Sequence, residues 1–97
     1  MNTQQSSIQQ LIGQQVGNYT IVQVILLDYN TALICCNDTK TETGTSHMEA
    51  EHWRDENTFH YNNLFYDAEG NFIESEPVNM KPQNMRTFER LFASLSN

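Results

Sequence analysis

The sequence contains few basic residues. Its 97 residues include 5 Lys and Arg side chains against 12 Asp and Glu, and the formal net charge is −7 at pH 7. Proteins that bind nucleic-acid phosphates rely on clustered Lys and Arg, which release counterions from the phosphate backbone. The shortage of basic residues therefore argues against direct nucleic-acid binding.

Long apolar runs are also missing. No run approaches the roughly 20 apolar residues of a helix that spans a bilayer, so we expect no contact with a membrane. Residues 1–10 are polar and uncharged and lack the basic start and apolar segment of a secretory signal. These absences predict a cytoplasmic protein.

Cysteine and glycine are scarce, and their positions suggest no chemistry. Cys35 and Cys36 are adjacent, and neighbouring side chains on a strand point to opposite faces, which makes a disulfide between them geometrically poor. Buried free thiols are the better interpretation. The four glycines form neither a phosphate-binding loop nor a nucleophile elbow. We therefore expect no enzymatic activity and no cofactor.

The chain has the length of one domain, residues 1–97, in which we expect residues 1–5 to be a disordered tail. Ile8, Leu11, Ile12 and Val16 have helical spacing, and Ser6 with Gln9 fits a capping box. This pattern predicts a short helix from about Ser6. Its end is expected at Gly13 or at Gly17, because glycine commonly follows the last helical residue.

Several segments have the composition of antiparallel strands. Residues 19–28 are β-branched or aliphatic almost throughout, a turn sequence follows, and 31–36 is apolar again, which predicts a central hairpin. Two further strands are expected at 58–66 and 71–74, joined by a turn in which Gly70 takes positive φ.

Residues 45–54 fit two structures. Ser46 with Glu49 resembles a capping box, whereas the alternation of residue types favours a strand, which we prefer. A strand places His47, Glu49, Glu51 and Trp53 on one face and Met48, Ala50 and His52 on the other.

A C-terminal helix is predicted after a linker at 75–82. It begins near Pro82 or Asn84, and its apolar face consists of Met85, Phe88, Leu91, Phe92 and Leu95. The order of elements predicts an α+β fold: an antiparallel β-meander of four to five strands, flanked on one face by an N-terminal and a C-terminal helix.

The acidic residues are concentrated in the middle of the chain. Residues 41–80 hold nine of them and one basic residue, Arg54. A solubilising role explains such a segment about as well as a binding role does. The binding hypothesis is a non-catalytic module that engages a basic surface of a partner protein. Its predicted partner-binding residues are Glu49, Glu51, Trp53, Asp55, Glu56, Asp67, Glu69, Glu74 and Glu76.

Aromatic residues within the acidic segment are candidate anchors, and besides Trp53 these are Tyr61 and Tyr66. One form of the hypothesis is an inhibitor that imitates the charge of nucleic acid and blocks a nucleic-acid-binding protein. Phages and mobile elements encode proteins of this kind against host defence systems.

Two alternatives from other classes stay open. His47, His52 and His60 would bind a metal or a small molecule if they converge, although their spacing matches no common zinc site, and we predict no metal. The second alternative is a homodimer or larger homo-oligomer formed through an uncovered sheet face or an edge strand.

Overall fold

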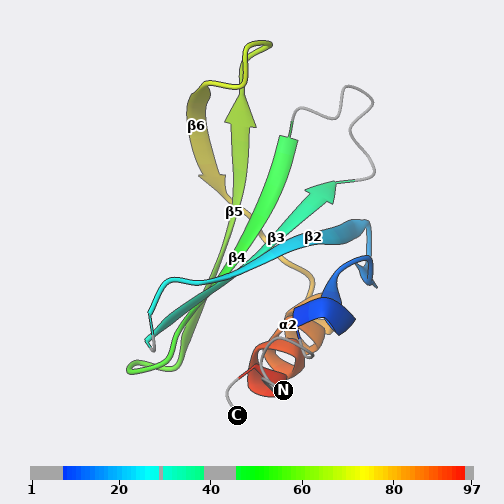
Figure 1. Ribbon diagram of the computed structural model, residues 1–97, viewed down its shortest axis with the longest axis vertical. Coiled ribbons are helices and arrows are strands. Elements are labelled where there is room, and N and C mark those ends of the chain that lie inside the picture. Colours follow the sequence, from blue (N-terminus) through cyan, green and yellow to red (C-terminus); the bar gives the residue numbers. More distant parts are fainter. Residues whose placement is uncertain (1–7, 29, 39–45, 96–97) are drawn as a thin grey trace.

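The computed structural model describes residues 8–28, 30–38 and 46–95, in which six strands form one antiparallel sheet (Figure 1). The strands follow one another in chain order, so the predicted α+β meander is confirmed, with six strands instead of four to five. The elements are a helical segment at 8–11, β1 (Gln15–Val16), β2 (Tyr19–Leu26), β3 (Thr31–Asp38), β4 (Ser46–Trp53), β5 (Thr58–Tyr66), β6 (Phe72–Pro77) and α2 (Pro82–Ser94).

The additional strand is β1, where the sequence pattern indicated the end of a helix. The helical residues stop at Leu11, and Gly13 turns the chain with a φ of 93°. The amide of Gly13 then donates to the carbonyl of Ile21 at 2.8 Å, and the amide of Ile21 donates to the carbonyl of Gln14 at 2.9 Å. Burial of Val16 in this edge strand, and not in a helix, therefore accounts for the apolar residue at this position. The alternative end at Gly17 is therefore wrong, and the predicted start at Ser6 lies outside the described residues.

Aspartates organise two of the turns. The Asp28 carboxylate accepts hydrogen bonds from the amides of Asn30 and Thr31, at 2.7 and 2.9 Å. Asp67 accepts in the same way from the amides of Glu69 and Asn71, at 3.0 and 2.8 Å. Such side chains satisfy backbone donors that would otherwise be unpaired in a tight turn.

The predicted strand choice for 45–54 is confirmed, and so is its division into two faces. Met48 and Ala50 are fully buried and His52 is 8 % exposed, whereas Trp53, on the other face, is 43 % exposed. β6 extends to Pro77, beyond the predicted end at Glu74.

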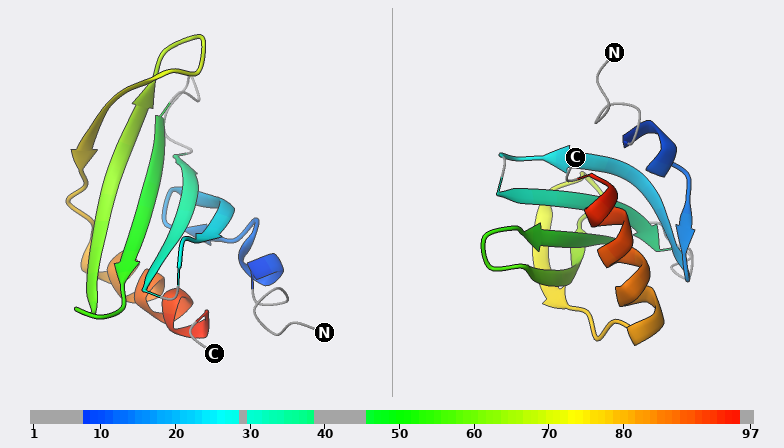
Figure 2. Two further views of the ribbon diagram at one scale, coloured as in Figure 1. Left: turned by 60° about the vertical axis from the view of Figure 1, so that its left-hand side comes forward. Right: turned by 90° about the horizontal axis from the view of Figure 1, so that it is seen from below.

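The core lies between one face of the sheet and α2. The Phe88 ring lies 5.7 Å from that of Tyr61, and the Phe92 ring lies 5.8 Å from that of Phe59. Leu11 belongs to the same buried cluster. α2 crosses the sheet obliquely (Figure 2). Its start at Pro82 is as predicted, since proline suits the first helical position.

The other side of the sheet, which we call the open face, points away from α2. Strand pairing assigns to it Gln23, Ile25, Leu33, Cys35, His47, Glu49, Glu51, Trp53, Thr58, His60, Asn62 and Leu64. No helix in the described parts of the chain combines the length and apolar character needed to cross a membrane.

Candidate functional site

Two carboxylates stand side by side on the open face. Glu49 and Glu51 are separated by one residue on β4, so their side chains leave the sheet in the same direction. Glu49 lies between Cys35 and Asn62 on the neighbouring strands. Glu51 lies between Leu33 and His60. Neither carboxylate therefore has a Lys or Arg beside it across the strands.

The setting of Glu49 is unfavourable to its charge. Partial burial raises the pKa of Glu49 above its ordinary value, and the negative charge of Glu51 raises it further. A positively charged group brought to this position would reverse both effects, because it would compensate the lost hydration and the repulsion. The site is thus suited to a cation.

Aromatic and apolar groups border the two carboxylates. Trp53 continues the row on β4, and its ring lies 5.4 Å from that of His60. On the other side of Glu49 the sheet is hollowed by a cavity of about 600 Å³. Ile25 and Val22 of β2, Leu64 and Tyr66 of β5, and His47 and Glu49 of β4 are among its lining residues.

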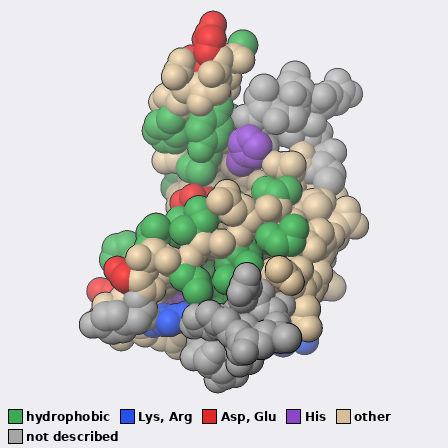
Figure 3. Space-filling view, viewed as in Figure 1, with side chains coloured by type: hydrophobic (Ala, Val, Ile, Leu, Met, Phe, Trp, Pro, Cys, Tyr) green, Lys and Arg blue, Asp and Glu red, His purple; other side chains and the backbone are tan. Residues whose placement is uncertain are grey.

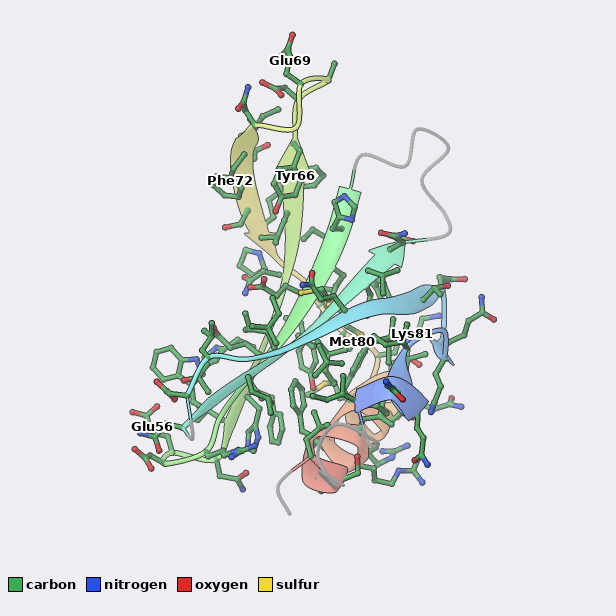
Figure 4. The ribbon with its side chains drawn as sticks, viewed as in Figure 1. Glu56, Tyr66, Glu69, Phe72, Met80 and Lys81 are labelled. Carbon is green, nitrogen blue, oxygen red and sulfur yellow. The ribbon has the colours of Figure 1, made fainter. Side chains whose placement is uncertain are left out.

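The open face is thus mixed in character. Figure 3 shows hydrophobic side chains in separate groups, with a histidine and acidic side chains between them. The upper group lies over β5 and β6, where the Tyr66 ring makes an edge contact with the Phe72 ring at 5.9 Å (Figure 4). Such a combination of apolar, aromatic and charged groups is typical of binding surfaces.

The other predicted acidic residues do not join Glu49 and Glu51. Asp55 and Glu56 lie in the β4–β5 turn, and Glu69 lies in the β5–β6 turn at the opposite end of the sheet (Figure 4). Glu74 and Glu76 pair with Phe65 and Asn63, and Asn63 shares the face of Met48, which is the covered side. The nine residues therefore occupy several separate places.

Asp67 has a role within its turn. Hydrogen bonds from Asn71 and Glu69 lower the pKa of its carboxyl group. Among the candidate anchors, Tyr61 is buried against α2 and is unavailable to a partner. Trp53 and Tyr66 are on accessible parts of the molecule.

The three histidines do not converge. His52 is on the covered side, where its ring stacks on Phe59 at 4.3 Å, while His47 and His60 are on the open face. Within residues 8–28, 30–38 and 46–95, no group of three or more His, Cys, Asp or Glu side chains is placed to hold a metal ion. The arrangement that the metal hypothesis requires is not formed by these residues.

The two thiols are protonated at neutral pH. Burial raises the pKa of Cys35 to about 11, with a contribution from Glu49, and burial raises that of Cys36 to about 12. Because the thiolate is the nucleophilic form, neither cysteine is activated.

Basic side chains are found on the helical side of the molecule. Arg86 and Arg90 belong to α2 and Lys81 precedes it, while the Arg54 guanidinium donates to the carbonyl of Leu95 at 3.4 Å. The fifth basic residue, Lys40, lies outside the described residues. Among the described residues that strand pairing assigns to the open face, none is Lys or Arg.

Sequence reasoning missed the cavity. Its apolar lining comes from Val22, Ile25 and Leu64, none of which was a candidate. A signal was present in the nearly continuous apolar character of 19–28, because half of those side chains must point away from the core.

Comparisons of the chain with protein-family models, curated proteins and solved structures find no match.

Proposed function

We propose that this protein is a non-catalytic binding module that uses its open face to engage a basic surface of a partner protein. The observation that carries the proposal is the pair Glu49 and Glu51, two neighbouring carboxylates on one face of β4 whose cross-strand partners include no Lys or Arg. In this proposal both helical segments pack on the opposite side of the sheet, so the open face is available to the partner.

Trp53 is the aromatic anchor of the interface. Its indole is 43 % exposed next to the two carboxylates, and exposed aromatic residues often contribute a large share of interface energy. Arg and Lys residues of the partner would pair with Glu49 and Glu51. Partner surfaces of this composition are common on nucleic-acid-binding proteins, so inhibition by charge mimicry is the form of the function that we favour.

Self-association through β6 is the competing proposal. Phe72 and Ile73 are 58 % and 59 % exposed on this edge strand, which favours pairing with another strand. Glu74 and Glu76 oppose it, because two copies with a net charge of −7 would bring like charges together. Sedimentation velocity separates the two proposals, since a stable dimer would support self-association.

The main test is capture of binding partners from a lysate of the source cells at low and moderate salt. The test variant is Glu49→Gln with Glu51→Gln. Its matched control is Glu74→Gln with Glu76→Gln, which removes the same charge with the same spacing from a different strand. We expect capture to weaken with salt and to fall at least about tenfold in the test variant only, roughly 1.4 kcal/mol.

The alternative results have distinct meanings. An equal loss in both variants would show that net charge matters and that the open face does not. Undiminished capture by the test variant, with salt having no effect, would refute the proposal. The melting curves of all variants must match for either comparison to hold.

A further inference from the structure

The cavity beside Glu49 has a size suited to a ligand. Its volume of about 600 Å³ is within the usual range of about 300 to 1,000 Å³ for binding pockets. Val22 and Ile25 of β2 and Leu64 and Tyr66 of β5 contribute apolar and aromatic wall, and Ala68 and Gly70 of the β5–β6 turn complete one side. Residues from distant parts of the sheet therefore converge on one hollow.

Two of the polar side chains that line the cavity, both on β4, can accept hydrogen bonds from a ligand. Nδ1 of His47 lies 2.9 Å from Oδ1 of Asn37, and an amide oxygen can only accept, so Nδ1 carries the proton. In the neutral ring Nε2 is then an acceptor. The Glu49 carboxylate is a second acceptor in the same lining, and it carries a negative charge. The matching ligand group is a donor with positive charge.

Aromatic groups narrow the choice of cation. The His47 and Tyr66 rings are in edge contact at 5.4 Å and both line the cavity. A guanidinium stacks on aromatic rings and is more weakly hydrated than an ammonium, so it enters a partly apolar cavity at lower cost. The volume leaves room for an apolar side chain beside it.

We propose that this cavity receives an arginine side chain of the protein partner together with an adjacent apolar side chain. The inference rests on the proposed function and specifies its anchor. Glu49 would be the counterion, with Tyr66 and His47 as aromatic contacts, and Ile25 and Leu64 would contact the apolar neighbour.

The probe is the blocked dipeptide N-acetyl-leucyl-arginine amide, titrated into the isotope-labelled protein. We expect saturable chemical-shift changes at the amides of Ile25, Leu64 and Tyr66, with a dissociation constant on the order of 1 mM because the ligand is small. The matched probe has citrulline in place of arginine, which keeps the shape and removes the charge. It should bind at least about tenfold more weakly.

Two variants test whether the cavity itself is the site. Val22→Trp fills it without altering charge, and Ile12→Trp is the control, because both residues are 44 % exposed and only Val22 lines the cavity. Binding should be lost in Val22→Trp and unchanged in Ile12→Trp. If the spectrum of Val22→Trp shows misfolding, Ala68→Trp blocks the cavity from the exposed turn instead.

Failure of this inference is distinguishable from failure of the proposed function. Equal binding of both dipeptides, no saturable shifts, or binding that survives in a folded cavity-filled variant would each overturn the arginine site. Charge-dependent partner capture would then still stand, because Glu49→Gln with Glu51→Gln tests it independently. Loss of partner capture in Val22→Trp but not in Ile12→Trp would support the arginine site in the full interface.

Discussion

Replacement of Phe88 by alanine tests the packing on which the fold depends. The Phe88 side chain is fully buried, and its ring is 5.7 Å from that of Tyr61 across the interface between α2 and the sheet. Truncation of a buried phenylalanine costs about 3–5 kcal/mol, through lost burial and the cavity left behind. A domain of this length has a free energy of unfolding of about 5–15 kcal/mol. The variant should therefore lose a large fraction of its stability.

Urea unfolding followed by circular dichroism measures the loss. At a slope of about 1–3 kcal/mol per molar urea, the midpoint should fall by on the order of 2 M. Phe72→Ala is the control: it is the same substitution, but Phe72 is 58 % exposed, and it should cost less than about 1 kcal/mol. Equal effects of the two substitutions would refute the packing of α2 on the sheet.

Two further predictions concern backbone and thiol chemistry. In the same urea assay, Gly17→Ala should lower the stability of the protein more than Gly70→Ala does. Both glycines have positive φ, so alanine costs about 1–2 kcal/mol at either position. Only at Gly17 would the added Cβ also lie 2.6 Å from Nδ2 of Asn84. Adding Asn84→Ala to Gly17→Ala should recover part of this difference in stability, because it removes the side chain that the Cβ meets. If the effects of the two substitutions on stability simply added, the predicted clash would be contradicted. Cys35 should be alkylated by iodoacetamide on the order of 100-fold more slowly in the folded than in the unfolded protein near pH 8, because its pKa is raised to about 11 from 9.0. Rapid labelling of the folded protein, followed by mass spectrometry, would contradict this.

Local patterns were sufficient where one physical effect dominated. The alternation of residues in 45–54 identified the buried side of β4, because burial selects Met48 and Ala50 on one face only. Pro82 and the apolar spacing identified α2 for a similar reason. In these segments the residue types and the tertiary environment favour the same structure.

β1 shows where such patterns fail. Val16 continues the helical spacing of Ile8, Leu11 and Ile12, yet it packs into the same core from a two-residue strand. The deciding interactions are the hydrogen bonds that join Gly13 and Gln14 to Ile21, and a pairing between distant residues leaves no periodic signal.

The acidic surface shows a second limit. Sequence proximity suggested that nine residues act together, but the register of β5 and β6 puts Glu74 and Glu76 on the side opposite Glu49. The bulge between Phe65 and Tyr66 contributes to this arrangement, since an extra residue changes which side chains share a face. Strand register is a tertiary property, so charge counting along the chain does not reveal it.

Glu49 provides a pH-dependent test of the binding proposal. Its pKa in the free protein is raised by burial and by Glu51, whereas a bound cation would lower it. Binding then releases a proton in the window above the ordinary glutamate value, so affinity should rise with pH through that window and level off beyond it. Three other titratable groups are near Glu49: His47 and Asp67 also line the cavity, and Cys35 is the cross-strand neighbour of Glu49 on β3.

The free protein should show the opposite trend. A raised pKa means that the folded state holds more protons than the unfolded state in this window, so the contribution of Glu49 to stability declines as pH rises through it. Glu49→Gln should remove both trends, in calorimetric titration of the captured partner and in urea midpoints measured against pH. Glu69→Gln, at the exposed turn, removes the same charge and should retain them. An affinity that falls with rising pH in the wild type would contradict pairing of Glu49 with a cation, because protonation of the carboxylate can only weaken that pair.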